Sequence, residues 1–208
     1  SGVMIRHVSA AENHCLAVSE SGDLYAWGSN QYGQLGFVGS NSSSGRKNKE
    51  DICDTPRVVK ALRKHVITGM AAGTRHSCAY SALGDLWVWG DNTSGQLGSH
   101  NPNATAHSTN TVTWTPELLT LGSSHQSRRV RTRILQATAS HDSTLILREC
   151  ADNNGQDRGN GGGSPLFSYE SLNKQSTEVF QLGHGAFLPA RISFVSPEQQ
   201  QSMAASHS

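Results

Sequence analysis

One stretch of this sequence occurs twice, and the two copies align without a gap at an offset of 62 residues. The first copy is Ala10–Gly36, the second is Ala72–Gly98, and 14 of their 27 positions are identical. Such self-similarity is typical of repeat architectures, in which each unit buries its apolar face against its neighbours. The sequence therefore directs attention to surfaces that could recognise a partner rather than to a single active-site pocket.

Each copy contains the pattern of a β-hairpin. Alternating segments at His14–Ser19 and Asp23–Trp27 form the first hairpin, and His76–Ser81 and Asp85–Trp89 form the second. Gly22 and Gly84 lie in the connecting turns, where glycine adopts the positive φ of a tight turn without strain.

Further strands flank the hairpins. Ile67–Ala72 predicts a strand before the second hairpin. Pro56–Val59 and Pro116–Leu119 predict outer edge strands, because proline cannot donate to a central ladder. Four short antiparallel strands per repeat make one blade of a β-propeller.

A third, eroded copy follows the first two. Gln136–Leu147 matches the small-residue turn and the next strand, and a gapless alignment places Asp142 where His14 and His76 stand. The remaining matches are Leu166–Tyr169 in the place of Leu86–Trp89, a restored Q-L-G at Gln181–Gly183, an edge strand at Pro189–Ile192, and Met203–Ser206 as an echo of Met70–Gly73.

The predicted fold is all-β, with about three four-stranded blades of a propeller that form an incomplete ring. We place blade 1 at about 8–66, blade 2 at about 67–133, blade 3 at about 134–200 and the start of a further blade at 201–208. We expect the chain to be part of a longer propeller, and partial propellers expose strand edges and apolar faces.

Three motifs resemble the repeats of the regulator of chromosome condensation family. They are A-A-G-x-x-H-S at Ala71–Ser77, G-D-L-W-x-W-G at Gly84–Gly90 and N-x-x-G-Q-L-G at Asn92–Gly98. The resemblance implies a seven-bladed propeller. The long interblade loops and eroded third blade also resemble scaffold proteins of the inhibitor of Bruton's tyrosine kinase type, which implies a ubiquitin-ligase adaptor as the parent chain.

Composition excludes several classes of protein. A formal net charge of +1 gives no strong global field for nucleic acid or anionic membranes, and no apolar run has the length of a membrane span. The four cysteines, Cys15, Cys53, Cys78 and Cys150, lack the spacing of zinc or redox motifs and are interpreted as structural. We expect a cytoplasmic or nuclear protein, because free cysteines are typical of reducing compartments.

His14 and His76 are the residues that a catalytic or metal hypothesis would use. Because both occupy one repeat position, we interpret them as buried imidazoles that bridge backbone groups between strands or blades. Trp27 and Trp89 are interpreted as blade core. The prediction is a non-enzymatic chain with no catalytic residue, cofactor or metal.

Residues that break the repeat are the candidates for recognition, because loops on a rigid scaffold carry binding specificity. The loops Phe37–Thr55 and Ser99–Thr115 are long, and arginines concentrate in Ser127–Arg133. The candidate partner-binding residues are Arg46, Lys47, Lys49, Arg128, Arg129, Arg131 and Arg133. A solvated strand edge is the alternative interpretation of the arginine cluster.

The leading functional prediction is a protein-protein interaction module in a scaffold, adaptor or regulatory protein. The resemblance implies two alternatives: guanine-nucleotide exchange on a small GTPase, since the founding family member acts on Ran, and chromatin binding through arginines. The expected partner is a protein, either a small GTPase or a ubiquitin-ligase component. We expect no binding to membranes, and binding to nucleic acid only through chromatin.

Overall fold

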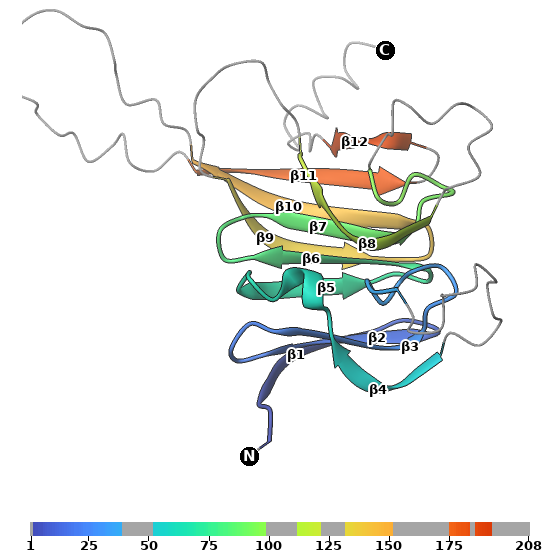
Figure 1. The fold of residues 1–208 in the computed structure, drawn as a ribbon. Helices are drawn as coiled ribbons and strands as arrows, with labels where there is room; N and C mark the ends of the chain where they lie inside the picture. The colour runs from blue at the N-terminus through green and yellow to red at the C-terminus, as the bar shows by residue number, and fades with distance from the viewer. Residues whose placement is uncertain are drawn as a thin grey trace, which may run out of the picture.

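A computed structural model describes residues 2–38, 52–98, 112–121, 132–151, 175–183 and 186–192 of the 208-residue chain. These residues form three four-stranded antiparallel sheets, in which strands adjacent in sequence are adjacent in space. Figure 1 shows the sheets lying one over another, with the N-terminal sheet at one end of the stack. The predicted all-β architecture of stacked blades in an incomplete ring is confirmed.

Blade 1 contains β1 (Ile5–Ala10), β2 (His14–Ser19), β3 (Leu24–Ser29) and β4 (Ile52–Val58). Blade 2 contains β5 (Ile67–Ala72), β6 (His76–Ser81), β7 (Leu86–Asp91) and β8 (Val112–Leu119). Blade 3 contains β9 (Thr132–Ala139), β10 (Ser143–Ala151), β11 (Gln175–Gly183) and β12 (Ala186–Ile192). A short 3-10 helix, η2 (Lys60–Leu62), joins the first two blades. The predicted start of a further blade at 201–208 lies outside the described residues.

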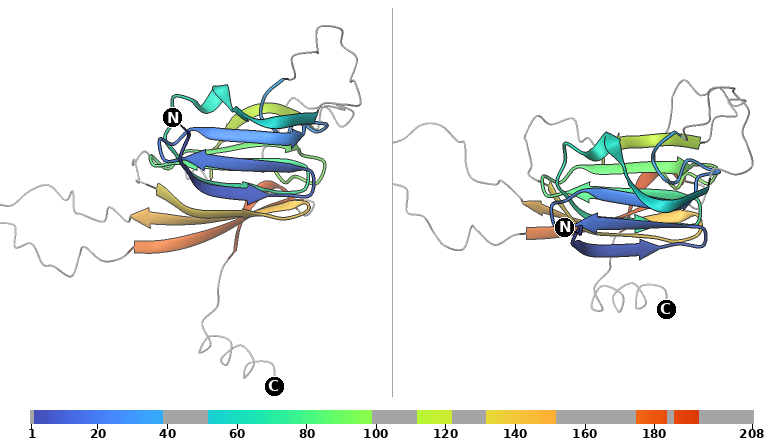
Figure 2. Two further views of the ribbon diagram at one scale, coloured as in Figure 1. Left: turned by 90° about the horizontal axis from the view of Figure 1, so that it is seen from below. Right: turned by 60° about the horizontal axis from the view of Figure 1, so that its bottom comes forward.

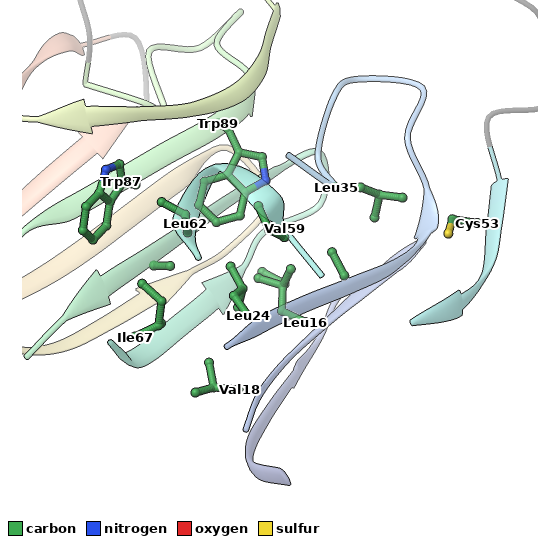
Figure 3. Close-up of a cluster of buried hydrophobic side chains, with 13 residues drawn as sticks. Leu16, Val18, Leu24, Leu35, Cys53, Val59, Leu62, Ile67, Trp87 and Trp89 are labelled. Atoms are coloured by element: carbon green, nitrogen blue, oxygen red, sulfur yellow. The ribbon is translucent and has the colours of Figure 1, made fainter. Parts of the chain in front are cut away.

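An apolar cluster lies between each pair of neighbouring blades. Leu16, Val18 and Leu24 of blade 1 pack with Ile67, Trp87 and Trp89 of blade 2, and Val59 and Leu62 around η2 complete the cluster (Figure 3). Between blades 2 and 3, Cys78, Val88 and Leu97 pack with Ile146, Phe180 and Leu182. The cores are thus interfaces between sheets, as stacked repeats require.

A glycine sets the register of the central hairpin in every blade. Gly28 pairs with His14 and Gly90 with His76, at φ of 104° and 109°. A Cβ at either glycine would meet the carbonyl oxygen of the residue before the histidine at 2.5 Å, so only glycine permits this close approach. In blade 3, Gly183 has φ of 91° and pairs with Ser143.

This register corrects the sequence alignment of blade 3 in two places. Ser143, not Asp142, occupies the position of His14 and His76. Gln181–Gly183 is not a restored Q-L-G turn, because it forms the end of β11. β11 pairs with β10 as β7 pairs with β6, so β11 is the strand equivalent to Leu86–Gly90. The prediction that Leu166–Tyr169 takes this place is therefore wrong. The predicted edge strand at Pro189–Ile192 is confirmed as part of β12.

The tryptophan prediction holds for one copy only. Trp89 is fully buried between blades 1 and 2, whereas Trp27, at the equivalent position, is only half-buried. Trp89 faces blade 1, so the equivalent face of blade 1 points away from blade 2. Trp27 therefore belongs to a surface rather than to a core within the described residues.

Candidate interaction surface

The repeated histidine of blade 1 connects that blade to blade 2. His14 Nε2 lies 2.8 Å from Ser77 Oγ, and Ser77 Oγ donates a hydrogen bond to the Gln34 carbonyl at 2.8 Å. His14 belongs to β2 and Ser77 to β6, while Gln34 lies in the turn after β3. The three residues form a hydrogen-bonded chain from blade 1 to blade 2 and back.

The same chain recurs one blade further on. His76 Nε2 lies 2.7 Å from Thr144 Oγ1, which donates to the Gln96 carbonyl at 3.2 Å. Thr144 is fully buried and occupies in blade 3 the position that Ser77 has in blade 2, so both positions carry a hydroxyl. The prediction that the histidines bridge blades is thus confirmed, with one addition: a hydroxyl carries the bridge from imidazole to backbone.

The hydrogen-bond pattern assigns the tautomer of both histidines. Each hydroxyl gives its proton to a carbonyl, so each Nε2 carries hydrogen and donates. Nδ1 of both rings is buried without a hydrogen-bond partner. Burial lowers the pKa of His14 from 6.5 to about 4, and burial followed by repulsion from His14 lowers the pKa of His76 to about 4. Both rings are neutral near pH 7 and face another blade instead of solvent.

Other polar residues shared by the repeats are also used internally. Trp89 Nε1 donates to the Gln34 carbonyl at 2.8 Å. Asn30 Oδ1 accepts from the Leu35 amide, and Gln34 Oε1 accepts from the Tyr32 amide, which closes the turn around Gly33. Equivalent bonds link Asn92 to Leu97 and Gln96 to Ser94. These groups shape turns and interfaces.

The described residues contain no group of three or more histidine, cysteine or acidic side chains that could hold a metal ion. Cys15, Cys53 and Cys78 are free thiols, and burial raises the pKa of Cys78 to about 12, which suppresses thiolate chemistry there. The side chain of Cys150 lies outside the described residues. In the part of the chain that is described, no helix is long and apolar enough to cross a membrane.

Of the seven residues predicted to bind a partner, the structure describes Arg133. Arg46, Lys47, Lys49, Arg128, Arg129 and Arg131 lie outside the described residues. Arg133 is exposed near the start of β9 and pairs across the sheet with Glu149. Its role in binding a partner stays a prediction.

Sequence reasoning missed Arg148, which connects blade 3 to the end of blade 2. Its guanidinium donates to the Leu121 carbonyl at 2.6 Å, forms an ion pair with Glu178, and stacks over Phe180 at 4.6 Å from the ring centre. The partly buried side chain has few contacts left for a partner, so we assign it a structural role.

Sequence reasoning also missed a groove on the outer rim between blades 1 and 2, which we call the rim groove. It encloses about 600 Å³ and is lined by Gly36, Phe37, Val38, Arg57, Val58, Lys60, Ala61, Arg63 and Thr115. Three cations line it at every third sequence position, and that spacing was the available signal. The groove itself depends on η2 and on the packing of η2 near β8, which the pattern of strands did not predict.

The comparisons with known proteins agree with this architecture. The sequence profile described as "Regulator of chromosome condensation (RCC1) repeat" matches residues 21–80 and 84–147, and a second profile of the same description matches 5–34 and 67–96. Human "E3 ubiquitin-protein ligase HERC2" is 40% identical over 91 residues, which is 44% of this chain and 2% of that protein.

Two solved yeast structures share the fold. "Crystal structure of Kap60 bound to yeast RCC1 (Prp20)" matches with a TM-score of 0.60 at 18% identity, over 97% of this chain and 45% of that one. The structure of Prp20p from Saccharomyces cerevisiae, whose description names its binding properties to Gsp1p and histones, matches with a TM-score of 0.60 at 17% identity, over 98% and 47%. The chain thus spans less than half of these yeast relatives and a small fraction of the human ligase.

Proposed function

Because this chain belongs to the regulator of chromosome condensation (RCC1) repeat family, we propose that it is a protein-interaction module within a scaffold, adaptor or regulatory protein of the cytoplasm or nucleus. One observation carries the proposal: the histidine, hydroxyl and tryptophan groups at repeat positions bond from blade to blade. Because those groups stabilise the stack, recognition falls to residues outside the repeat pattern. We propose no catalytic activity for the chain itself.

Two loops are the first regions to test. Residues 39–51 and 99–111 can each be replaced by a glycine-serine segment of equal length in an epitope-tagged chain expressed in cells. The replacements spare Phe37, whose carbonyl accepts a bond from Asn30 at 2.8 Å, and Cys53, which is buried in blade 1. Both groups therefore stay in the replaced chains, and a loss of binding is compared with the control replacement below.

We expect at least one replacement to remove partners that the unchanged chain recovers in immunoprecipitation with mass spectrometry. Replacement of 152–163, a polar insertion in the third repeat, is the matched control. If both loop-replaced chains keep every partner of the unchanged chain, the loops are not the recognition surface.

Guanine-nucleotide exchange is the candidate from another class. The family resemblance supplies this candidate, because the founding family member acts on the small GTPase Ran, and a Candida albicans protein named "Protein RCC1" is 33% identical over 86 residues, 41% of this chain and 18% of that protein. An exchange factor needs only a surface that stabilises the nucleotide-free GTPase. Release of fluorescent GDP from a panel of small GTPases tests this candidate, and the absence of acceleration by the 208-residue chain would exclude it for that panel.

A further inference from the structure

We propose that the rim groove binds an acidic peptide segment of a partner protein, with an apolar side chain of the peptide on the groove floor and flanking carboxylates on Arg57, Lys60 and Arg63. This assignment rests on the proposed function as an interaction module and gives it a binding surface and a ligand chemistry.

The position of the groove favours a peptide held by side chains over a peptide that pairs with a sheet edge as an additional β-strand. Figure 2 shows η2 beside β4 at the outer edge of blade 1, with β8 of blade 2 behind them. β4 and β8 are each one of the two edge strands of their sheets. Each contains a proline, Pro56 or Pro116, which lacks the amide hydrogen that strand addition would use. Each proline thus weakens the edge as a template for strand pairing, and the proposal assigns the contacts to side chains.

The charge of the groove is one-sided. Its lining residues include three cations and no carboxylate. Arg57, Lys60 and Arg63 are exposed and form no ion pair with any acidic side chain in the described ranges. Asp54 and Glu117 are near in sequence but do not line the groove. With a formal net charge of only +1 for the whole chain, this is a local feature suited to acidic groups.

Four of the lining residues are apolar, and we call them the floor of the groove. They are Phe37, Val38, Val58 and Ala61, and Val38 is 57% exposed. An exposed apolar surface bordered by cations fits a peptide that carries both an apolar side chain and carboxylates. A nucleic-acid backbone would satisfy the cations but leave this floor uncovered, and Phe37 is half-buried rather than open for base stacking.

The test measures binding of a fluorescein-labelled peptide to the full 208-residue chain by fluorescence anisotropy. The peptide carries a central Leu-Phe pair flanked on each side by two glutamates. We expect saturable binding that weakens as salt rises, because exposed charges are screened. Two comparison peptides replace either the glutamates by lysines or the central pair by alanines, and both should bind at least about tenfold more weakly.

The decisive variant is Arg57→Glu with Arg63→Glu. Its matched control, Lys64→Glu with Arg6→Glu, makes the same change of charge at exposed residues that do not line the groove. We expect at least about a tenfold loss of peptide affinity in the groove variant and less than about a twofold change in the control. Thermal melts of both variants check that the chain remains folded.

Three results would overturn the assignment. An equal loss of peptide affinity in both variants would mean non-specific electrostatic attraction. The absence of saturable binding would mean that the groove binds no such peptide. Groove-dependent binding of a duplex DNA but not of the peptide would assign the groove to nucleic acid. None of these affects the loop-replacement test in cells, so failure of the groove and failure of the interaction function are distinguishable.

Discussion

The imidazoles of His14 and His76 differ from catalytic bases in their surroundings rather than in their chemistry. Each ring is buried between two sheets, donates from Nε2 to a hydroxyl of the next blade, and has its pKa lowered to about 4 by loss of hydration. A general base at neutral pH needs solvent or substrate at its free nitrogen. Here Nδ1 is enclosed, so the ring serves as a neutral hydrogen-bond donor.

A pH dependence of stability follows from these pKa values. The folded-state pKa of each histidine, about 4, lies below the unfolded value of 6.5, so the unfolded state binds more protons between these limits. Stability is fully present above pH 6.5 and is lost as the pH falls towards 4. At pH 5 each histidine should lower the free energy of unfolding by on the order of 2 kcal/mol relative to neutral pH.

Urea denaturation at pH 7.5 and pH 5 measures this effect in the unchanged chain and in His76→Gln, whose amide can still donate to Thr144. The variant should lose roughly 2 kcal/mol less than the unchanged chain between the two pH values. Equal losses in the two chains would show that His76 is not protonated on unfolding as we describe.

The hydroxyl of Thr144 should matter more than its methyl group. Thr144→Val keeps the shape but deprives His76 Nε2 and the Gln96 carbonyl of their partner, which should destabilise the chain by about 2–3 kcal/mol. Thr144→Ser keeps the hydroxyl and loses one methyl, for about 1 kcal/mol. The free energy of unfolding in urea measures both, and a Val variant as stable as the Ser variant would contradict the hydrogen-bonded chain.

At the scale of elements, the equivalent tryptophans of blades 1 and 2 differ in whether they reach a neighbouring sheet. Trp89 contacts the opposite sheet and donates to the Gln34 carbonyl, whereas Trp27 has the same place in its own hairpin but is half-buried. In blade 3, Leu182 holds this place and cannot donate to the Gln96 carbonyl. Thr144 supplies that bond alone among the described residues.

Trp89→Phe should therefore cost on the order of 2–3 kcal/mol through the lost hydrogen bond and the space left behind. Trp27→Phe, the matched change on the outward face of blade 1, should cost about 1 kcal/mol or less in the 208-residue chain. Thermal denaturation of both variants provides the comparison. A similar decrease in Tm for the two variants would mean that each tryptophan stabilises its own hairpin rather than the interface between blades.

At the scale of the whole molecule, blades 1 and 2 could be predicted because their residues repeat, and blade 3 could be predicted only in outline. The offset between equivalent histidine positions grows from 62 residues, His14 to His76, to 67, His76 to Ser143. Blade 3 lacks the Trp-Gly pair, so a gapless alignment slipped by one residue. Leu182 and Gly183 then resembled a turn, although strand pairing places them at the Trp-Gly position.

The rim groove could not be predicted for a different reason. Its cations, Arg57, Lys60 and Arg63, belong to one blade and its connection, but Thr115 comes from the next blade. The repeat pattern predicts only the features that neighbouring blades share. The groove depends on the connection between the blades, η2, which is not part of the repeat. The loop cations named from sequence lie outside the described residues, so their role stays a prediction.

The central claim is that the polar residues of the repeat join blade to blade, which leaves recognition to the unrepeated surface. A double-mutant cycle on His14→Phe and Ser77→Ala, measured as free energies of unfolding in urea, tests it most directly. We predict that the two changes together cost less than their sum, with a coupling energy of about 1 kcal/mol or more. Additive effects, with a coupling within about 0.3 kcal/mol of zero, would contradict the claim.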